Sequence, residues 1–77
     1  MTLELFSSKT CPYCRQIREE LEWDALDYVE YDVDRDRAAR ERLIELVGAN
    51  AMVPVLVEDG AVKQIGVAGR GCYLSVT

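Results

Sequence analysis

The spacing of apolar and polar positions along this chain predicts six secondary-structure elements. Short apolar runs bounded by turn-forming residues are typical of strands, and apolar residues that recur every three or four positions are typical of helices. The predicted order is strand, helix, strand, helix, strand, strand. The expected strands cover residues 3–6, 27–33, 53–58 and 61–65. The first helix covers residues 12 to about 23, and the second follows a cap at Asp34 or Asp36 and runs to about Val47.

The first expected helix carries a clear apolar stripe. Cys14, Ile17 and Leu21 are spaced by three and four residues, so we expect them to face the core. Pro12 suits the first helical position, where its missing N–H would have no partner in any case. We expect Trp23 to pack the end of this helix against the core, and stacking on a ligand is the less favoured alternative.

The segment 27–33 alternates in a way that predicts a half-exposed strand at a sheet edge. One side would carry Val29, Tyr31 and Val33, and the other Tyr28, Glu30 and Asp32.

The second half of the chain predicts a helix followed by a hairpin. The dipeptide Asp59-Gly60 between two apolar runs is a strong signal for a two-residue hairpin, whose strands must be antiparallel. The first strand–helix–strand unit should be parallel with a right-handed crossover. The second helix is expected to end at Gly48 and to bury Ala39, Leu43, Leu46 and Val47.

Length and charge narrow the class of protein. We expect residues 1–77 to form one domain, near the lower size limit for a self-sufficient core. The net charge of −5 argues against nucleic acid as a partner, and the arginines between 35 and 42 alternate with acids as on a solvated helix. We expect no signal peptide and no membrane span, and we do not expect three cysteines, an odd number, to form a secreted disulfide framework. We therefore expect a cytoplasmic protein in a reducing compartment.

The candidate chemistry lies in Cys11-Pro12-Tyr13-Cys14, at the start of the first helix. A sulfur at Cys11 would face unpaired backbone N–H groups and the positive end of the helix dipole, which stabilise a thiolate. Cys14 shares a helix face with Cys11, because residues three apart are neighbours on a helix, and a disulfide between them is geometrically reasonable. The motif indicates a redox dithiol in which Cys11 attacks and Cys14 resolves.

Other uses of a C-x-x-C motif fit this sequence less well. A zinc site needs about four ligands, and the chain has no histidine and one further cysteine, Cys72, so we expect no metal. Covalent haem attachment requires a histidine after the second cysteine, where Arg15 stands. A purely structural disulfide within one helical turn would constrain little of the unfolded chain.

Three features taken together resemble a glutaredoxin of the dithiol type: the C-P-Y-C motif, Val53-Pro54 about forty residues later, and the late Ile65-Gly66. The resemblance covers about residues 1 to 68. It implies an α/β thioredoxin-like fold, with a four-stranded mixed sheet and helices on both faces. The expected strand order is second, first, third, fourth. It also implies that Cys11 is exposed and that the Val53–Pro54 peptide bond is cis.

The resemblance further implies a set of glutathione contacts. The backbone of Val53, before Pro54, would pair with the cysteinyl part of glutathione, and Tyr13 would flank the groove. A basic residue before the motif, here Lys9, and one on the second helix, Arg37 or Arg40, would hold the glycine carboxylate. The γ-glutamyl end would meet the segment that begins with Gly66 and Val67. No bound cofactor is expected, and glutathione would be a co-substrate.

The sequence departs from the family pattern at three places. The lysine common three residues before the first cysteine is replaced by Ser8, and the usual threonine two before the proline is replaced by Met52. The usual Gly-Gly pair with following acidic residues reads Gly66-Val67-Ala68-Gly69-Arg70. An acidic partner for the γ-glutamyl ammonium is absent there, and Arg70 has the opposite charge.

The C-terminal residues are too few for the usual final helix. Residues 72–77 allow under two helical turns, and they also alternate like a strand, so both a shortened helix and an extended tail stay open. Cys72 is either a buried apolar residue, the favoured reading because free cysteine behaves as a small hydrophobe, or an extra reactive thiol.

Three functions follow from the resemblance. The leading hypothesis is a thiol–disulfide oxidoreductase that reduces protein disulfides and glutathione mixed disulfides, with glutathione and a glutathione reductase system as the electron source. A redoxin reduced by thioredoxin reductase, donating electrons to ribonucleotide reductase, is the alternative. An iron–sulfur cluster carrier is less favoured, because Pro12 stiffens the motif.

Overall fold

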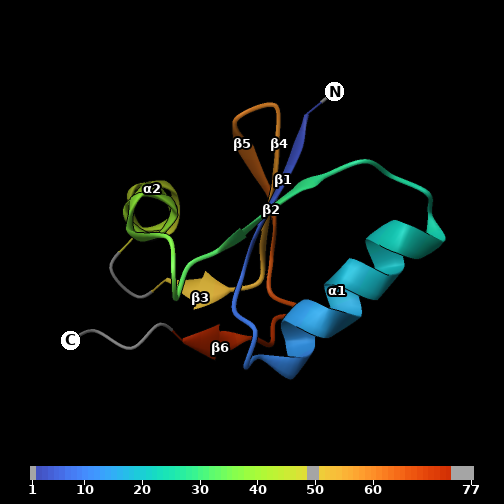
Figure 1. The fold of residues 1–77 in the computed structure, drawn as a ribbon, viewed down its shortest axis with the longest axis horizontal. Helices are drawn as coiled ribbons and strands as arrows, with labels where there is room; N and C mark the ends of the chain where they lie inside the picture. Colours follow the sequence, from blue (N-terminus) through green and yellow to red (C-terminus); the bar gives the residue numbers. More distant parts are fainter. Residues whose placement is uncertain (1, 49–50, 74–77) are drawn as a thin grey trace.

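The computed structural model of the chain describes residues 2–48 and 51–73. Two helices and six strands follow one another along it (Figure 1), and their order contains every predicted element. Their bounds are β1 Leu3–Ser7, α1 Pro12–Trp23, β2 Val29–Asp32, α2 Arg37–Val47, β3 Met52–Val53, β4 Val55–Glu58, β5 Ala61–Ile65 and β6 Cys72–Tyr73.

Four of the strands form a mixed sheet in the order β2-β1-β4-β5. β1 pairs in parallel with β2 and antiparallel with β4, and the β4–β5 hairpin is antiparallel. This is the strand order that the resemblance implies, because β4 and β5 are the third and fourth strands of the sequence-based prediction. β2 lies at an edge of the sheet, as its alternating pattern predicts.

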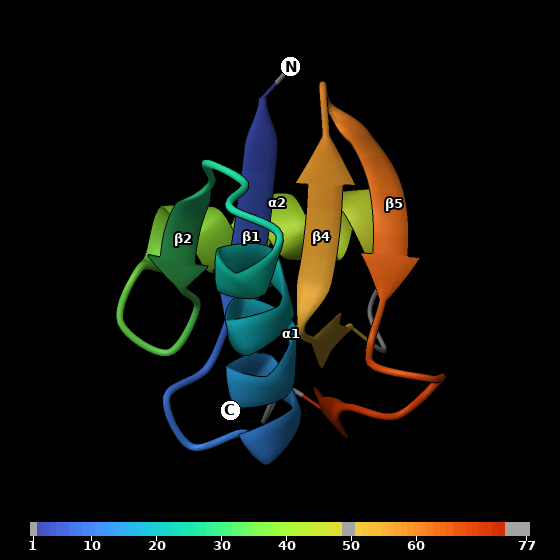
Figure 2. The same cartoon turned by 90° about the vertical axis from the view of Figure 1, so that its right-hand side faces the viewer.

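The helices cover opposite faces of this sheet, with α1 on one side and α2 on the other (Figure 2). Because side chains alternate along a strand, β1 contributes to both cores. Leu3 and Leu5 pack with Ile17 and Leu21 of α1, whereas Phe6 packs with Leu43 of α2. The fold is thus the thioredoxin-like arrangement that the resemblance implies.

Local sequence signals end and begin the elements where they were expected. Asp36 is the N-cap of α2, and its carboxylate accepts a hydrogen bond of 3.1 Å from the backbone N–H of Ala39. Gly48 ends that helix with a φ of 95°. Asp59 and Gly60 both have positive φ values, 51° and 84°, which the tight β4–β5 turn requires. In α2, Ala39 and Leu43 are buried as predicted, whereas Leu46 and Val47 are half-buried.

Two expectations about the fold are corrected. The expected strand 53–58 is broken, because Pro54 has no N–H to donate to a ladder and separates β3 from β4. Trp23 does not pack against the core, since its side chain is 90% exposed. It follows Leu21 by two residues, about 200° around the helix, and therefore points away from the buried stripe.

A prediction about acid stability rests on the ion pair between α1 and β2. Arg18 Nη2 lies 2.5 Å from Glu30 Oε2, and this guanidinium holds the pKa of Glu30 below its ordinary value. A lowered folded-state pKa stabilises the protein above the unfolded value of about 4.3, and this stabilisation is lost as pH falls through the folded value. We expect Arg18→Gln to cost about 1 kcal/mol of unfolding free energy at pH 7. That difference should vanish near pH 2.

Urea unfolding at a series of pH values measures this effect. Arg15→Gln is the matched control, because Arg15 lies on the same helix but pairs with Glu19 in an exposed position. It should change the unfolding free energy by less than about 0.5 kcal/mol at every pH. A deficit of Arg18→Gln that persisted unchanged at pH 2 would show that the effect does not come from Glu30 ionisation.

Within residues 2–48 and 51–73, no helix is long and apolar enough to cross a membrane.

Candidate functional site

The site forms where β1 leads into α1. After Ser7 the chain turns, and the N–H of Cys11 donates to the carbonyl of Ser8 at 3.3 Å. Cys11 is the N-cap of α1 with an extended backbone, and Pro12 follows at the first helical position, as predicted. The N–H of Cys14 donates to the Cys11 carbonyl at 3.2 Å. The Cys11 sulfur therefore belongs to the helix N-terminus, where backbone dipoles favour a thiolate.

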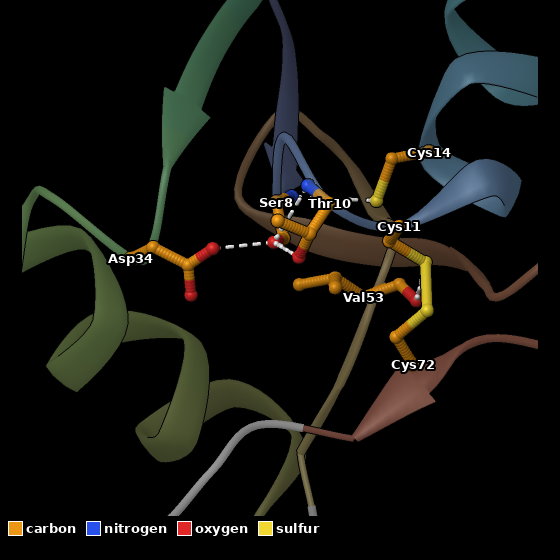
Figure 3. Close-up of a disulfide and its surroundings, with 7 residues drawn as sticks. All are labelled: Ser8, Thr10, Cys11, Cys14, Asp34, Val53 and Cys72. Atoms are coloured by element: carbon orange, nitrogen blue, oxygen red, sulfur yellow. Dashed lines mark hydrogen bonds between the residues drawn. A yellow bond between two sulfur atoms is a disulfide. The ribbon is translucent and has the colours of Figure 1, made fainter.

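Cys11 forms a disulfide with Cys72 and not with Cys14 (Figure 3). The two residues are 61 positions apart in sequence, and their Cα atoms are 6.0 Å apart. Cys11 is only 3% exposed, so the expectation of an exposed sulfur is wrong for this state of the protein. The reason is the C-terminal strand, which brings Cys72 onto the Cys11 sulfur.

Cys14 is a free thiol in this structure and is fully buried. Its sulfur accepts a hydrogen bond of 3.4 Å from the backbone N–H of Ser8. Burial raises the pKa of the Cys14 thiol, and the Ser8 hydrogen bond offsets this only in part. Cys14 is therefore held in its protonated form at neutral pH, and its predicted role as the resolving thiol stays a prediction.

A small polar network fixes the loop before Cys11. The hydroxyl of Ser8 donates to a carboxylate oxygen of Asp34, which follows β2, and it lies 3.0 Å from the Thr10 hydroxyl oxygen. Ser8 thus holds Asp34 through its side chain and Cys14 through its backbone (Figure 3). Ser8, which stands where the family commonly has a lysine, thus connects this loop to the segment that follows β2.

The backbone of Val53 is paired with the strand that carries Cys72. β3 and β6 form a two-stranded antiparallel sheet, with Val53 opposite Cys72 and Met52 opposite Tyr73. Figure 1 shows the two strands side by side, beyond the end of the main sheet. The Val53 carbonyl oxygen lies 3.8 Å from the Cys11 sulfur, and the Val53–Pro54 peptide bond is cis, as the resemblance implies.

A tight turn leads the chain into β6. Residues 67–70 close it through two backbone hydrogen bonds between Val67 and Arg70, at 2.7 and 2.9 Å. Ala68 and Gly69 have φ values of 53° and 78°, the left-handed region that such a turn needs. A strand follows at residues 72–73, and the remainder of the expected helix or tail lies outside the described residues. The segment that would meet the γ-glutamyl group is this turn.

The remaining predicted contact residues lie in different surroundings. Tyr13 is half-buried against the core, and Val67 packs against the cluster on the α1 side. Lys9 lines a surface hollow with Arg18, Glu30 and Asp32. Arg37, which pairs with Glu41 at 3.5 Å, lines a different hollow that also includes Arg40. The joint binding of a glycine carboxylate by Lys9 and Arg37 stays a prediction.

Cys72 is the site residue whose role the sequence left open between a buried apolar residue and an extra reactive thiol. The favoured reading, a buried apolar residue, is wrong, because Cys72 is half-buried and bonded to Cys11. Its alternative, an extra reactive thiol, agrees with this bond. The available signal was the strand-like alternation that begins at Cys72, preceded by a glycine at position 71.

Comparisons with known proteins place the chain in a family. It matches the family model described as Glutaredoxin over residues 3–62. A probable glutaredoxin of Synechocystis sp. is 28% identical over 74 residues, covering 90% of this chain and 68% of that protein. An uncharacterised glutaredoxin-like 8.6 kDa protein of Clostridium pasteurianum is 33% identical over 58 residues, covering 75% of this chain and 76% of that protein.

Solved structures agree with this placement. A mutant of the thioredoxin-like protein BC3987 is similar with a TM-score of 0.74 at 31% identity, covering 87% of this chain and 85% of that one. A glutaredoxin from Archaeoglobus fulgidus shares the fold, with a TM-score of 0.68 at 20% identity over 84% and 74% of the two chains. The family match spans Cys11, Cys14, Val53 and Pro54. The chain therefore belongs to the glutaredoxin family of thiol–disulfide oxidoreductases.

Proposed function

We propose that this protein reduces protein disulfides and glutathione mixed disulfides, with Cys11 as the attacking thiol and glutathione as the electron donor. The observation that carries the proposal is the position of the Cys11 sulfur. It lies at the N-terminus of α1, 3.8 Å from the Val53 carbonyl, and is already joined to a second sulfur. The site therefore accommodates a disulfide between Cys11 and a cysteine on a strand paired with Val53.

The reaction proceeds by two thiol–disulfide exchanges. The Cys11 thiolate attacks one sulfur of the target, the target S–S bond breaks, and the released thiolate takes up a proton. A second thiolate then attacks Cys11, breaks the mixed disulfide and frees the other target sulfur. For a protein disulfide the sequence-based assignment of this second thiol is Cys14, and the structure offers Cys72 as well. For a glutathione mixed disulfide, free glutathione serves.

Glutathione binding at this site should be weak. The contacts carried over from the family are Val53, Pro54, Tyr13, Lys9, Arg37, Gly66 and Val67. Of these, the Val53 backbone is paired with β6, and the tight turn at residues 67–70 carries no acidic side chain for the γ-glutamyl ammonium. A charge-assisted hydrogen bond contributes about 1.5–3 kcal/mol, so its loss should raise the Michaelis constant more than it lowers the turnover number.

Oxidation of NADPH with each reductase in turn tests the proposed donor. The protein would be supplied with a disulfide-containing protein and either glutathione with glutathione reductase or thioredoxin reductase alone. We expect turnover with the glutathione system, at a high Michaelis constant for glutathione. Turnover with thioredoxin reductase, together with no turnover in the glutathione system, would reject glutathione as the donor and support the alternative redoxin.

The proposed setting is the cytoplasm, where reducing conditions keep a catalytic dithiol available. The partners are disulfide-containing and glutathionylated proteins, together with the reductase system that supplies the electrons.

A further inference from the structure

We propose that Cys72 is the resolving cysteine of this protein, so that the redox couple for protein disulfides is Cys11–Cys72. This inference rests on the proposed thiol–disulfide exchange at Cys11 and replaces Cys14 in its second step.

The strand β6 delivers Cys72 to Cys11 in a defined register. Cys72 lies opposite Val53 in the β3–β6 pair, and the Val53 carbonyl is the group 3.8 Å from the Cys11 sulfur. Backbone pairing with Val53 and the disulfide with Cys11 thus both hold Cys72 beside the N-terminus of α1. A thiol that returns to this register after reduction is already aligned with Cys11.

Two glycines let the chain approach this closely. A Cβ at Gly71 would lie 2.5 Å from the Val53 carbonyl oxygen and 3.0 Å from the Met52 sulfur. A Cβ at Gly66 would lie 2.5 Å from the Arg70 carbonyl oxygen, and the N–H of Gly66 donates to the Pro54 carbonyl at 2.7 Å. Since neither position has room for a side chain, the return of the chain from β5 to Cys11 depends on both glycines.

Cys14 is less suited to the second step. Its sulfur is held by the Ser8 N–H at 3.4 Å and has no solvent exposure. The attacking species in disulfide exchange is a thiolate, and burial keeps the Cys14 thiol protonated at neutral pH. Cys72 is half-buried on a two-residue strand, in register with Val53 and bonded to the Cys11 sulfur.

The proposed cycle balances without a further oxidant. The Cys11 thiolate attacks the target disulfide, forming the Cys11–target bond and releasing one target thiolate, which takes a proton. Cys72 then loses its proton, and its thiolate attacks the Cys11 sulfur. The Cys11–Cys72 bond forms, the Cys11–target bond breaks, and the second target thiolate takes a proton. Two protein thiols are oxidised and one target disulfide is reduced to two thiols.

The test is a single turnover with a fully reduced protein and an excess of a disulfide-containing protein, without a reductase. Mass spectrometry of acid-quenched, alkylated peptides then identifies the disulfide formed and any adduct with the target. Cys72→Ser and Cys14→Ser are matched variants. We expect Cys14→Ser to release reduced target within about twofold of the wild-type rate and to form Cys11–Cys72. We expect Cys72→Ser to accumulate the Cys11–target adduct and to release the second target thiol at least tenfold more slowly.

Gly71→Ala supplies a second readout, because it keeps all three thiols and adds only a methyl group where β6 meets Val53. We expect the first step, measured as formation of the adduct, to keep its rate. Release of the second target thiol should fall at least fivefold. A far-ultraviolet spectrum identical to that of the wild type confirms that the variant is folded, and an unchanged release rate in such a variant would overturn the proposal.

Further outcomes separate this inference from the proposed function. Adduct accumulation in Cys14→Ser, with normal release in Cys72→Ser, would assign the second step to Cys14 and overturn the inference alone. Loss of release only when both cysteines are replaced would also overturn it, since either thiol would then serve. A wild-type protein that formed no Cys11–target adduct would refute the attack at Cys11 and the inference together.

Discussion

Replacing Cys11 by serine is expected to abolish turnover on both protein disulfides and glutathione mixed disulfides, by at least about a thousandfold. Both reactions begin with attack by a thiolate, and a serine hydroxyl is not ionised near neutral pH. Cys11 is the N-cap of α1, and the other two cysteines lie inside the helix and on β6. Neither can take its place at the helix N-terminus. NADPH oxidation coupled to glutathione and glutathione reductase measures the effect.

Cys14→Ser and Cys72→Ser are the controls for this prediction when the substrate is a glutathione mixed disulfide. That reaction needs one protein thiol, because free glutathione resolves the adduct, so both controls should keep most of the wild-type turnover. The thermal midpoint of each variant shows that it is folded. Appreciable turnover by Cys11→Ser would contradict the assignment of Cys11 as the nucleophile. So would a loss of turnover in Cys14→Ser as complete as the loss in Cys11→Ser.

Leu43→Ala is expected to lower the free energy of unfolding by about 2–5 kcal/mol. Leu43 has no exposed surface and packs between α2 and the sheet, in the cluster with Phe6, Val55 and Val57. Truncation removes three buried carbon atoms and leaves a cavity that the close-packed core fills only in part. A domain of this length has a total stability of roughly 4–12 kcal/mol, so the change removes a large part of it.

Urea unfolding followed by circular dichroism measures this loss, with Ile44→Ala as the matched control. Ile44 is the next residue of the same helix but is 37% exposed, so its truncation should cost about 1 kcal/mol or less. The comparison separates core packing from helix propensity, since both variants place alanine in α2. Equal losses in the two variants would show that the cluster around Leu43 is not a close-packed core.

Most of the fold follows from patterns among residues that are close together in the sequence. The stripe of Cys14, Ile17 and Leu21 is buried as predicted, because residues at spacings of three and four share one side of a helix whatever surrounds it. The N-cap Asp36 and the turn residues Asp59 and Gly60 act through their own backbone geometry. These signals also place Cys11 at the N-terminus of α1, so the location of the proposed nucleophile was predictable.

The exposure of a side chain was harder to predict where it depends on which way the side chain points from its helix. Trp23 is apolar and ends a helix with one buried stripe, yet its side chain points away from that stripe because it is about 200° from Leu21. The break between β3 and β4 at Pro54 has a local cause, the missing N–H of proline. The sequence predicts one strand there because the apolar run from Val53 is continuous.

By itself, the sequence determined the elements, their caps and the position of Cys11, because each depends on residues a few positions apart. Only the tertiary structure decided which thiol meets Cys11. Sequence proximity favours Cys14, but helix packing turns that sulfur into the interior and onto the Ser8 N–H. Cys72 arrives from 61 residues away because the 67–70 turn reverses the chain and Gly71 admits it beside Val53. Contacts between distant segments depend on how the whole chain packs, which no local pattern encodes.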